Sequence, residues 1–221
     1  MDREIRDSVK AAYLEYEEEP MAHYYSHWLV GYPSRLRVKK LLRELGNIKG
    51  KTVLDVGCED GYVSVKMARL GAKVIAFDVV KPSIEKLRKK IRKHGLSIKA
   101  FVAFAQKIPL KKGSIDAIVC TEVIEHMPKR EIAFAEFARV LRPGGIVVIT
   151  FPNEGLRKKL YPIVRLFGIN SDVEEHVTLF EYSAGQIKAM LRKHFTIVRS
   201  YRFPRFLPLT NMIVCRKPQK Y

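Results

Sequence analysis

The chain has 221 residues, of which 47% are hydrophobic and 29% charged, a balance that is typical of a folded protein and excludes global disorder. Its 41 basic residues outnumber its 23 acidic ones and give a formal net charge of +18. No apolar run is long enough to span a bilayer, and the N-terminus lacks the basic-then-apolar layout of a signal peptide. We therefore expect a cytoplasmic protein with one domain and short appendages.

The basic excess has two alternative explanations. A one-sided charge favours nucleic acid, an anionic membrane surface or an acidic substrate through long-range attraction. A thermophile-type surface is also rich in charge, although it enriches both signs. Because basicity alone does not identify a partner, both interpretations stay open.

The three cysteines do not form a framework. Cys58, Cys120 and Cys215 are far apart in the sequence, odd in number and set in apolar or glycine-containing segments. This pattern is typical of reduced packing thiols in a cytosolic protein, not of a zinc site or a disulfide scaffold.

Residues 1–34 carry an acidic run followed by an aromatic-rich stretch, and we interpret them as an N-terminal helical or lid segment. From residue 34 onwards, short apolar runs alternate with helical patterns. The predicted elements are, in chain order, a helix over 34–45, a strand over 52–56, a helix over 62–70, a strand over 73–78, a helix over 82–94, strands over 98–104 and 115–120, a helix over 129–141 and a strand over 144–151. Strands separated by helices predict an α/β fold with a mostly parallel sheet and helices on both faces.

After Pro152 this alternation breaks. Residues 153–182 are predicted to be an irregular or helical insertion, and a helix over 183–193 follows. The last two predicted strands, 195–201 and 211–216, are separated by too few residues for a crossover helix. They are therefore expected to pair as an antiparallel hairpin.

The first predicted strand ends in the stretch VGCEDG, where Gly57 and Gly61 allow a tight turn and a close approach to a ligand. The helix that follows offers unpaired N–H groups. The glycine spacing is not the G-x-G-x-x-G of dinucleotide binders. Asp55 would repel a pyrophosphate but suits an ammonium or sulfonium group, and Asp78 after the second strand suits the two hydroxyls of a ribose. These residues together predict a nucleoside with a cationic tail.

Five segments then carry a family resemblance: VLDVGCEDG, VIAFDV, AQKIPL, IDAIVCTEVIEHMP and LRPGGIVVITFPN. In this order they resemble the successive motifs of class I S-adenosylmethionine-dependent methyltransferases, most of all the small-molecule branch that includes ubiquinone and menaquinone biosynthesis enzymes. The resemblance is tight over 50–152 and looser at the C-terminal strand pair. It implies a Rossmann-like, seven-stranded, mostly parallel sheet with an antiparallel C-terminal strand, and S-adenosylmethionine as cofactor.

The resemblance also assigns roles to single residues. Asp55 is expected to orient the methionine amino group, and Asp78 to bind the ribose. Where relatives often carry an acid for the adenine amino group, this chain has Phe104, so the backbone of Ala105 or the amide of Gln106 is expected to substitute. The cofactor-binding residues expected in addition to these are Gly57, Cys58, Gly61, Val79 and Thr121.

The stretch TEVIEHMP supplies the candidate catalytic residues Glu122, Glu125 and His126. If this segment is helical, spacings of three and four place all three side chains on one face. The pattern resembles the metal ligands of methyltransferases that modify the terminal ribose of small RNAs, which use a further histidine for which His176 is the candidate. It is also common in metal-free relatives, where it closes the cofactor pocket, and we expect no metal here.

Together these features predict a methyltransferase domain over 35–221 that acts by in-line methyl transfer on a small-molecule or lipid-like acceptor. The insertion 153–182 is a candidate lid or substrate segment. The candidate substrate-binding residues are Tyr24, Trp28 and His176.

Two alternatives to this function stay open. The basic helix over 82–94 and the Glu-x-x-Glu-His pattern favour an RNA methyltransferase, with or without the help of a metal. The changed adenine position, Phe104, favours a catalytically silent protein that binds S-adenosylmethionine. The sequence itself carries no signal for an oligomeric state.

Overall fold

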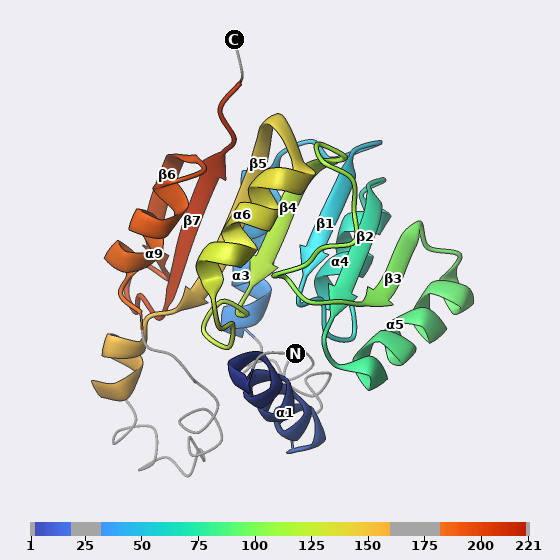
Figure 1. Ribbon diagram of the computed structural model, residues 1–221, viewed down its shortest axis with the longest axis horizontal. Helices are drawn as coiled ribbons and strands as arrows, with labels where there is room; N and C mark the ends of the chain where they lie inside the picture. The colour runs from blue at the N-terminus through green and yellow to red at the C-terminus, as the bar shows by residue number, and fades with distance from the viewer. Residues whose placement is uncertain (1–2, 19–31, 160–181, 220–221) are drawn as a thin grey trace.

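A seven-stranded sheet with the order β3-β2-β1-β4-β5-β7-β6 runs through the computed structural model, which describes residues 3–18, 32–159 and 182–219 (Figure 1). The strands are β1 (Thr52–Val56), β2 (Lys73–Asp78), β3 (Ile98–Val102), β4 (Ile115–Thr121), β5 (Leu141–Pro152), β6 (Thr196–Phe203) and β7 (Thr210–Arg216). The first five are parallel, and β7 runs antiparallel to both β5 and β6. The predicted fold class and the predicted hairpin are confirmed.

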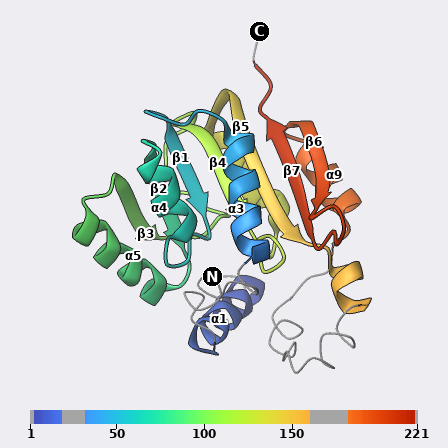
Figure 2. The same cartoon turned by 180° about the vertical axis from the view of Figure 1, so that it is seen from behind.

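Helices cover both faces of this sheet. They are α1 (Arg3–Glu18), α3 (Tyr32–Leu45), α4 (Tyr62–Arg69), α5 (Lys81–His94), α6 (Arg130–Val140) and α9 (Ala184–Arg192), with a short helix over 154–159. Figure 1 shows α6 and α9 on one face, and Figure 2 shows α3, α4 and α5 on the other. α1 lies below the carboxyl ends of the central strands in both views.

The central strands form because their apolar residues are buried on both faces. In β4, Ile118 and Cys120 pack toward α6 and α9, whereas Ala117 and Val119 pack toward α3 and α4. Alternate side chains of a strand point to opposite faces, so a continuous apolar run fills two cores at once. This is why a run such as IDAIVC is recognisable in the sequence as a central strand.

Several strand boundaries differ from the prediction, and two of the larger differences have a clear cause. β3 ends at Val102, because Phe104 turns back and forms an isolated bridge with Lys107. β5 begins at Leu141, three residues early, because Leu141 pairs with Ile115 ahead of an irregularity in the ladder. Pairing with β4 therefore sets where this strand begins.

The described residues include no helix that is long and apolar enough to cross a membrane. Cys58, Cys120 and Cys215 are all buried and free. The prediction that they are packing thiols outside any disulfide is therefore confirmed.

Candidate functional site

The carboxyl ends of β1, β2 and β4 lie side by side, because β1 pairs in parallel with both other strands. The chain winds in one direction from β1 to β3 and in the other from β4 onwards. Ligands of open α/β sheets bind at such a switch point, beyond the carboxyl ends of the strands. Three connections meet here: 57–61 after β1, 79–80 after β2 and 122–129 after β4.

The glycine loop after β1 is held against the end of β2. The N–H groups of Gly57 and Cys58 both donate to the carbonyl of Phe77, at 2.9 and 3.0 Å. Gly57 has φ +66°, and a Cβ placed there would lie 2.3 Å from a methyl group of Val123. Two constraints therefore require glycine at this position: the left-handed backbone conformation and the close approach of the β4 connection.

Asp78 links the glycine loop to the start of α5. Its two carboxylate oxygens accept hydrogen bonds from the N–H groups of Glu59 (2.8 Å) and Val80 (2.9 Å). Burial raises the pKa of Asp78, while these backbone hydrogen bonds act in the opposite direction. An ionised carboxylate has about four acceptor sites, so Asp78 keeps capacity for ribose hydroxyls.

Asp55 is 1% exposed and lies at the centre of this edge. Its Oδ2 accepts a hydrogen bond of 2.5 Å from the Ser64 hydroxyl, and its buried Oδ1 has no hydrogen-bond partner among the described residues. Burial, opposed by Ser64 and reinforced by the charge of Asp78, raises the pKa of Asp55 to about 7. A buried carboxylate oxygen without a partner is costly unless a ligand supplies one, so this site fits the ammonium group of a bound S-adenosylmethionine.

The side chain of Gln106, one of the residues expected to contact the adenine, also contacts the protein itself. Its side-chain nitrogen donates to the carbonyl of Pro128 at 2.6 Å, which ties the β3–β4 connection to the loop after β4. Ala105 is buried beside it. Adenine recognition by Ala105 or Gln106 therefore stays a prediction. The other expected contacts Cys58, Val79 and Thr121 lie at the ends of β1, β2 and β4, at the same edge.

The TEVIEHMP segment is not an α-helix, so the condition under which its three candidate residues would share one helical face is not met. Glu122 has φ +52° and turns the chain as β4 ends. Its N–H donates to the carbonyl of Thr150 at 3.0 Å, which extends the pairing with β5 by one residue. Tight turns follow, with His126 N–H bonded to the carbonyl of Val123 at 3.0 Å. The left-handed residue sends Glu122 and Glu125 in different directions.

Glu122 faces α3 and β5. Its Oε2 lies 3.1 Å from a guanidinium nitrogen of Arg37, and its Oε1 accepts a hydrogen bond of 2.9 Å from the Thr150 hydroxyl. Arg37 is a buried residue of α3, and Thr150 is fully buried in β5. Both carboxylate oxygens of Glu122 are thus engaged by the protein itself.

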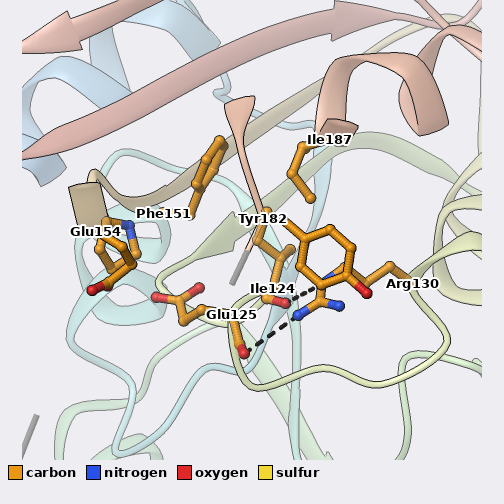
Figure 3. Close-up of a pocket in the computed structure, with 8 residues that line it drawn as sticks. Ile124, Glu125, Arg130, Phe151, Glu154, Tyr182 and Ile187 are labelled. Carbon is orange, nitrogen blue, oxygen red and sulfur yellow. Dashed lines mark hydrogen bonds between the residues drawn. The ribbon is translucent and has the colours of Figure 1, made fainter. Parts of the chain in front are cut away.

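Glu125 faces a small pocket between the β4 connection, the end of β5 and α9 (Figure 3). Its side chain is bounded by Glu154 across the pocket, and its Oε1 lies 4.0 Å from His126 Nε2. Its Oε2 is buried without a hydrogen-bond partner among the described residues. Burial, followed by the charge of Glu122, raises the pKa of Glu125 well above its usual range. The residues lining this pocket are Ile124, Glu125, Arg130, Phe151, Pro152, Glu154, Tyr182 and Ile187.

Arg130 fixes the wall of this pocket from the start of α6. It is 2% exposed, and its guanidinium donates to the carbonyls of Ile124 and Glu125. The Tyr182 ring covers the guanidinium at 4.0 Å, a cation–π distance (Figure 3). Burial lowers the pKa of Arg130 from its ordinary value.

The N-terminal helix α1 contacts two sides of the site. The Ser8 hydroxyl donates to the carbonyl of His126 at 2.7 Å. The Tyr13 hydroxyl accepts a hydrogen bond of 3.1 Å from the N–H of Lys81, the first residue of α5. α1 therefore joins the β4 connection to the segment that follows Asp78.

Comparison with known proteins supports the same interpretation. A family described as a methyltransferase domain matches residues 54–149. The ubiquinone biosynthesis O-methyltransferase of Sodalis glossinidius (strain morsitans) is 31% identical over 165 residues, which cover 72% of this chain and 61% of that protein. Residues 54–149 are a class I S-adenosylmethionine-dependent methyltransferase domain.

Solved structures extend the likeness in fold beyond this methyltransferase domain. The PH0226 protein from Pyrococcus horikoshii OT3 superposes with a TM-score of 0.71 at 21% identity, covering 91% of this chain and 97% of that one. A SAM-dependent methyltransferase from Aquifex aeolicus superposes with a TM-score of 0.65 at 22% identity, covering 84% and 93%. By contrast, the chain spans about half to three-fifths of the length of the curated relatives it matches.

The structure adds residues around the methyltransferase site that the sequence did not identify: Arg37, Thr150, Arg130, Ser8 and Tyr13. Arg37 belongs to a helix rich in lysine and arginine, where a solvated position is the ordinary expectation. No local signal marks one arginine of such a helix as buried. The start of a helix near Arg130 could be predicted from the sequence. The hydrogen bonds from the Arg130 side chain to the preceding carbonyls could not.

Three predicted substrate residues, Tyr24, Trp28 and His176, lie outside the described residues. Over 3–18, 32–159 and 182–219, no group of three or more histidine, cysteine, aspartate or glutamate side chains is arranged to hold a metal ion.

Proposed function

We propose that this chain transfers the methyl group of S-adenosylmethionine to a hydroxyl of a small, largely apolar acceptor. The observation that carries the proposal is the buried Glu125 carboxyl, which has an oxygen without a hydrogen-bond partner among the described residues and faces a pocket at the cofactor edge of the sheet. The relatives that the chain matches are named O-methyltransferases, which supports a hydroxyl acceptor.

On the cofactor side, Asp55 is proposed to hold the ammonium group and Asp78 the ribose, with Gly57 and Gly61 giving the backbone room to approach. Asp55 offers a buried oxygen without a partner among the described residues, and Asp78 offers further acceptor capacity. When bound, S-adenosylmethionine supplies an electrophilic methyl group on a sulfonium, which is a good leaving group. The protein then has to hold the acceptor in line and exclude water.

On the acceptor side, Glu125 is proposed to take the hydroxyl proton. A hydroxyl is a weak nucleophile until a base accepts its proton. Burial and the charge of Glu122 raise the pKa of Glu125, which makes its ionised form a stronger base. His126, with Nε2 4.0 Å from Glu125, is the adjacent group through which the proton leaves.

The pocket walls favour an uncharged acceptor. Ile124, Phe151, Pro152 and Ile187 are apolar, and the charged residues of the wall carry both signs, the carboxyls of Glu125 and Glu154 and the guanidinium of Arg130. We propose that the enzyme is cytoplasmic and that segments 1–34 and 153–182 close over the acceptor. Tyr24, Trp28 and His176 stay proposed substrate contacts within these segments.

Labelled S-adenosylmethionine in a fractionated lysate tests the function. The label is expected in small molecules that partition into organic solvent, and Glu125→Gln is expected to lower the rate about a hundredfold or more. The matched control is Glu131→Gln, an exposed glutamate on α6, which should leave the rate unchanged.

Calorimetry should show that Glu125→Gln still binds S-adenosylmethionine, because Glu125 is not among the proposed cofactor ligands. Label entering RNA would overturn the small-molecule acceptor. A Glu125→Gln variant as active as the parent would overturn the assignment of the base.

A further inference from the structure

The connection 122–129 is held in place by side chains from five other parts of the chain. Glu122 is held by Arg37 of α3 and Thr150 of β5. The carbonyls further along accept hydrogen bonds from other elements. These donors are Ser8 of α1 to His126, Gln106 of the β3–β4 connection to Pro128, and Arg130 of α6 to Ile124 and Glu125.

Glu122 begins this connection in an uncommon backbone conformation. A non-glycine residue keeps a positive φ only when several contacts with its surroundings hold the backbone there. At Glu122 three contacts do so: the backbone hydrogen bond to the Thr150 carbonyl, the side-chain hydrogen bond from Thr150, and the ion pair with Arg37. The direction in which the chain leaves β4 is therefore set by the partners of Glu122.

Glu125 stands in contrast to Glu122. Both oxygens of Glu122 have partners from the protein, whereas Oε2 of Glu125 is buried without a hydrogen-bond partner among the described residues. Glu122 points toward α3 and β5, and Glu125 points into the pocket (Figure 3). The same short motif thus contains one carboxylate whose oxygens are both engaged by the protein and one buried carboxylate that faces the pocket.

We propose that Glu122 is an anchor for this connection, not a base, and that Arg37 and Thr150 are positioning residues for methyl transfer. By holding Glu122 in its left-handed turn they direct Glu125 into the acceptor pocket. This proposal rests on the proposed function, because it takes Glu125 as the residue that contacts the acceptor.

Two substitutions of Glu122 separate an anchor from a base. In Glu122→Gln the amide oxygen still accepts from Arg37, and the amide nitrogen can donate to Thr150, whose hydroxyl can turn to accept. We expect Glu122→Gln to lower the maximal rate of label transfer by less than about tenfold, and Glu122→Ala by about a hundredfold or more. A base would be lost equally in both variants, so equal loss would overturn the proposal.

Substitutions of Thr150 and Arg37, the partners of Glu122, test their positioning role. Thr150→Val keeps the shape of the side chain and removes the hydroxyl, whereas Thr150→Ser keeps the hydroxyl. We expect Thr150→Val and Arg37→Gln to lower the maximal rate about tenfold or more, with the dissociation constant for S-adenosylmethionine changed less than about threefold. Thr150→Ser should recover most of the rate. A Thr150→Ser variant as slow as Thr150→Val, or an Arg37→Gln variant as fast as the parent, would overturn the proposal.

A control ion pair and hydrogen exchange distinguish positioning from general stability. Arg142 and Asp116 form an ion pair of 2.8 Å between β5 and β4 at the opposite, amino edge of the sheet. Arg142→Gln should leave the rate unchanged. Arg37→Gln should speed amide exchange in 122–128 but not in α9, and an equal increase throughout the chain would mean that Arg37 is merely structural.

The two proposals can fail separately. If Glu125→Gln is active, the proposed base fails, whatever the Glu122 variants do. If Glu125→Gln is inactive while Glu122→Gln is as slow as Glu122→Ala, the proposed function stands and the anchor role of Glu122 is overturned.

Discussion

Asp55 and Glu125 are two buried carboxyls that each keep one oxygen without a hydrogen-bond partner among the described residues. Burial raises the pKa of both groups because it disfavours the charged form. Such groups lower the stability of the fold and gain a partner only when a ligand arrives. Asp55 lies at the end of β1 and Glu125 lines the pocket beside β5 and α9, so the two groups fit the cofactor and acceptor contacts proposed above.

From the raised pKa of Asp55 we predict that S-adenosylmethionine binds more tightly as the pH rises toward 7. The pKa of Asp55 is raised to about 7, and a bound ammonium group favours the ionised carboxylate, so binding below that pH must release a proton. Between about pH 5.5 and 7 the ligand ammonium stays charged, and the dissociation constant should fall by up to about tenfold per pH unit. Calorimetry in buffers of different ionisation enthalpy measures both the affinity and the proton release.

The control for this prediction is Asp55→Asn, which should bind S-adenosylmethionine more weakly and without this pH dependence. The raised pKa also means that ionising Asp55 destabilises the ligand-free fold as the pH rises from about 4 through about 7. Asp55→Asn should therefore raise the Tm of the ligand-free protein at pH 8 and have less effect at pH 5. A parent protein whose affinity is constant over this range would contradict the prediction.

At the scale of elements, α1 bridges two connections that come from different strands. Ser8 bonds to the β4 connection, and Tyr13 bonds to the start of α5, directly after Asp78. A ligand that orders both connections also orders the helix that joins them.

We therefore predict that S-adenosylmethionine slows amide hydrogen exchange in α1 (Arg3–Glu18) by at least about fivefold, while exchange in β6, at the far edge of the sheet, changes little. A Ser8→Ala and Tyr13→Phe double variant is the control, because it should lose this protection in α1 but keep it in the glycine loop 57–61. Protection of 57–61 without any change in α1 of the parent would argue against the bridge.

At the scale of the whole molecule, the strongly basic helix α5 and the pocket lined by Glu125 are separated. The exposed basic side chains of α5 lie at the β3 end of the sheet, whereas the pocket lies beside α9 and the end of β5 (Figure 1). Attraction between exposed charges is screened within about 10 Å at ordinary salt concentrations. The charge of α5 is therefore expected to affect what adheres to the surface more than what enters the pocket.

At this scale we predict that the rate of methyl transfer is insensitive to the salt concentration. Raising the salt concentration from about 50 to about 300 mM should change methyl transfer to a small-molecule acceptor by less than about twofold, while binding to heparin or bulk RNA should fall steeply. Initial rates and filter binding across the same salt series provide the comparison. A rate that falls in parallel with RNA binding would instead favour a polyanionic substrate.

Much of the fold and the cofactor edge was predictable because the relevant signals are local. Seven strands and the order of helices followed from apolar runs and their spacing, and all seven strands are present. Asp55 and Asp78 could be chosen as candidate ligand-binding residues because they lie at the ends of predicted strands. The helical interpretation of TEVIEHMP failed because the backbone of Glu122 is set by its pairing with Thr150, a residue of the neighbouring strand.

The sequence by itself predicted the class I methyltransferase fold and a ligand edge at the glycine loop, because periodicity, glycine positions and strand-end acids depend on near neighbours along the chain. Only the tertiary structure decided which acid of the motif is committed to the fold and which faces a pocket. Burial and ion pairing depend on residues that are remote in sequence, as Arg37 is from Glu122. Nothing in the local sequence distinguishes Glu122 from Glu125. The contacts of Glu122 with α3 and β5 distinguish it from Glu125 in the folded chain.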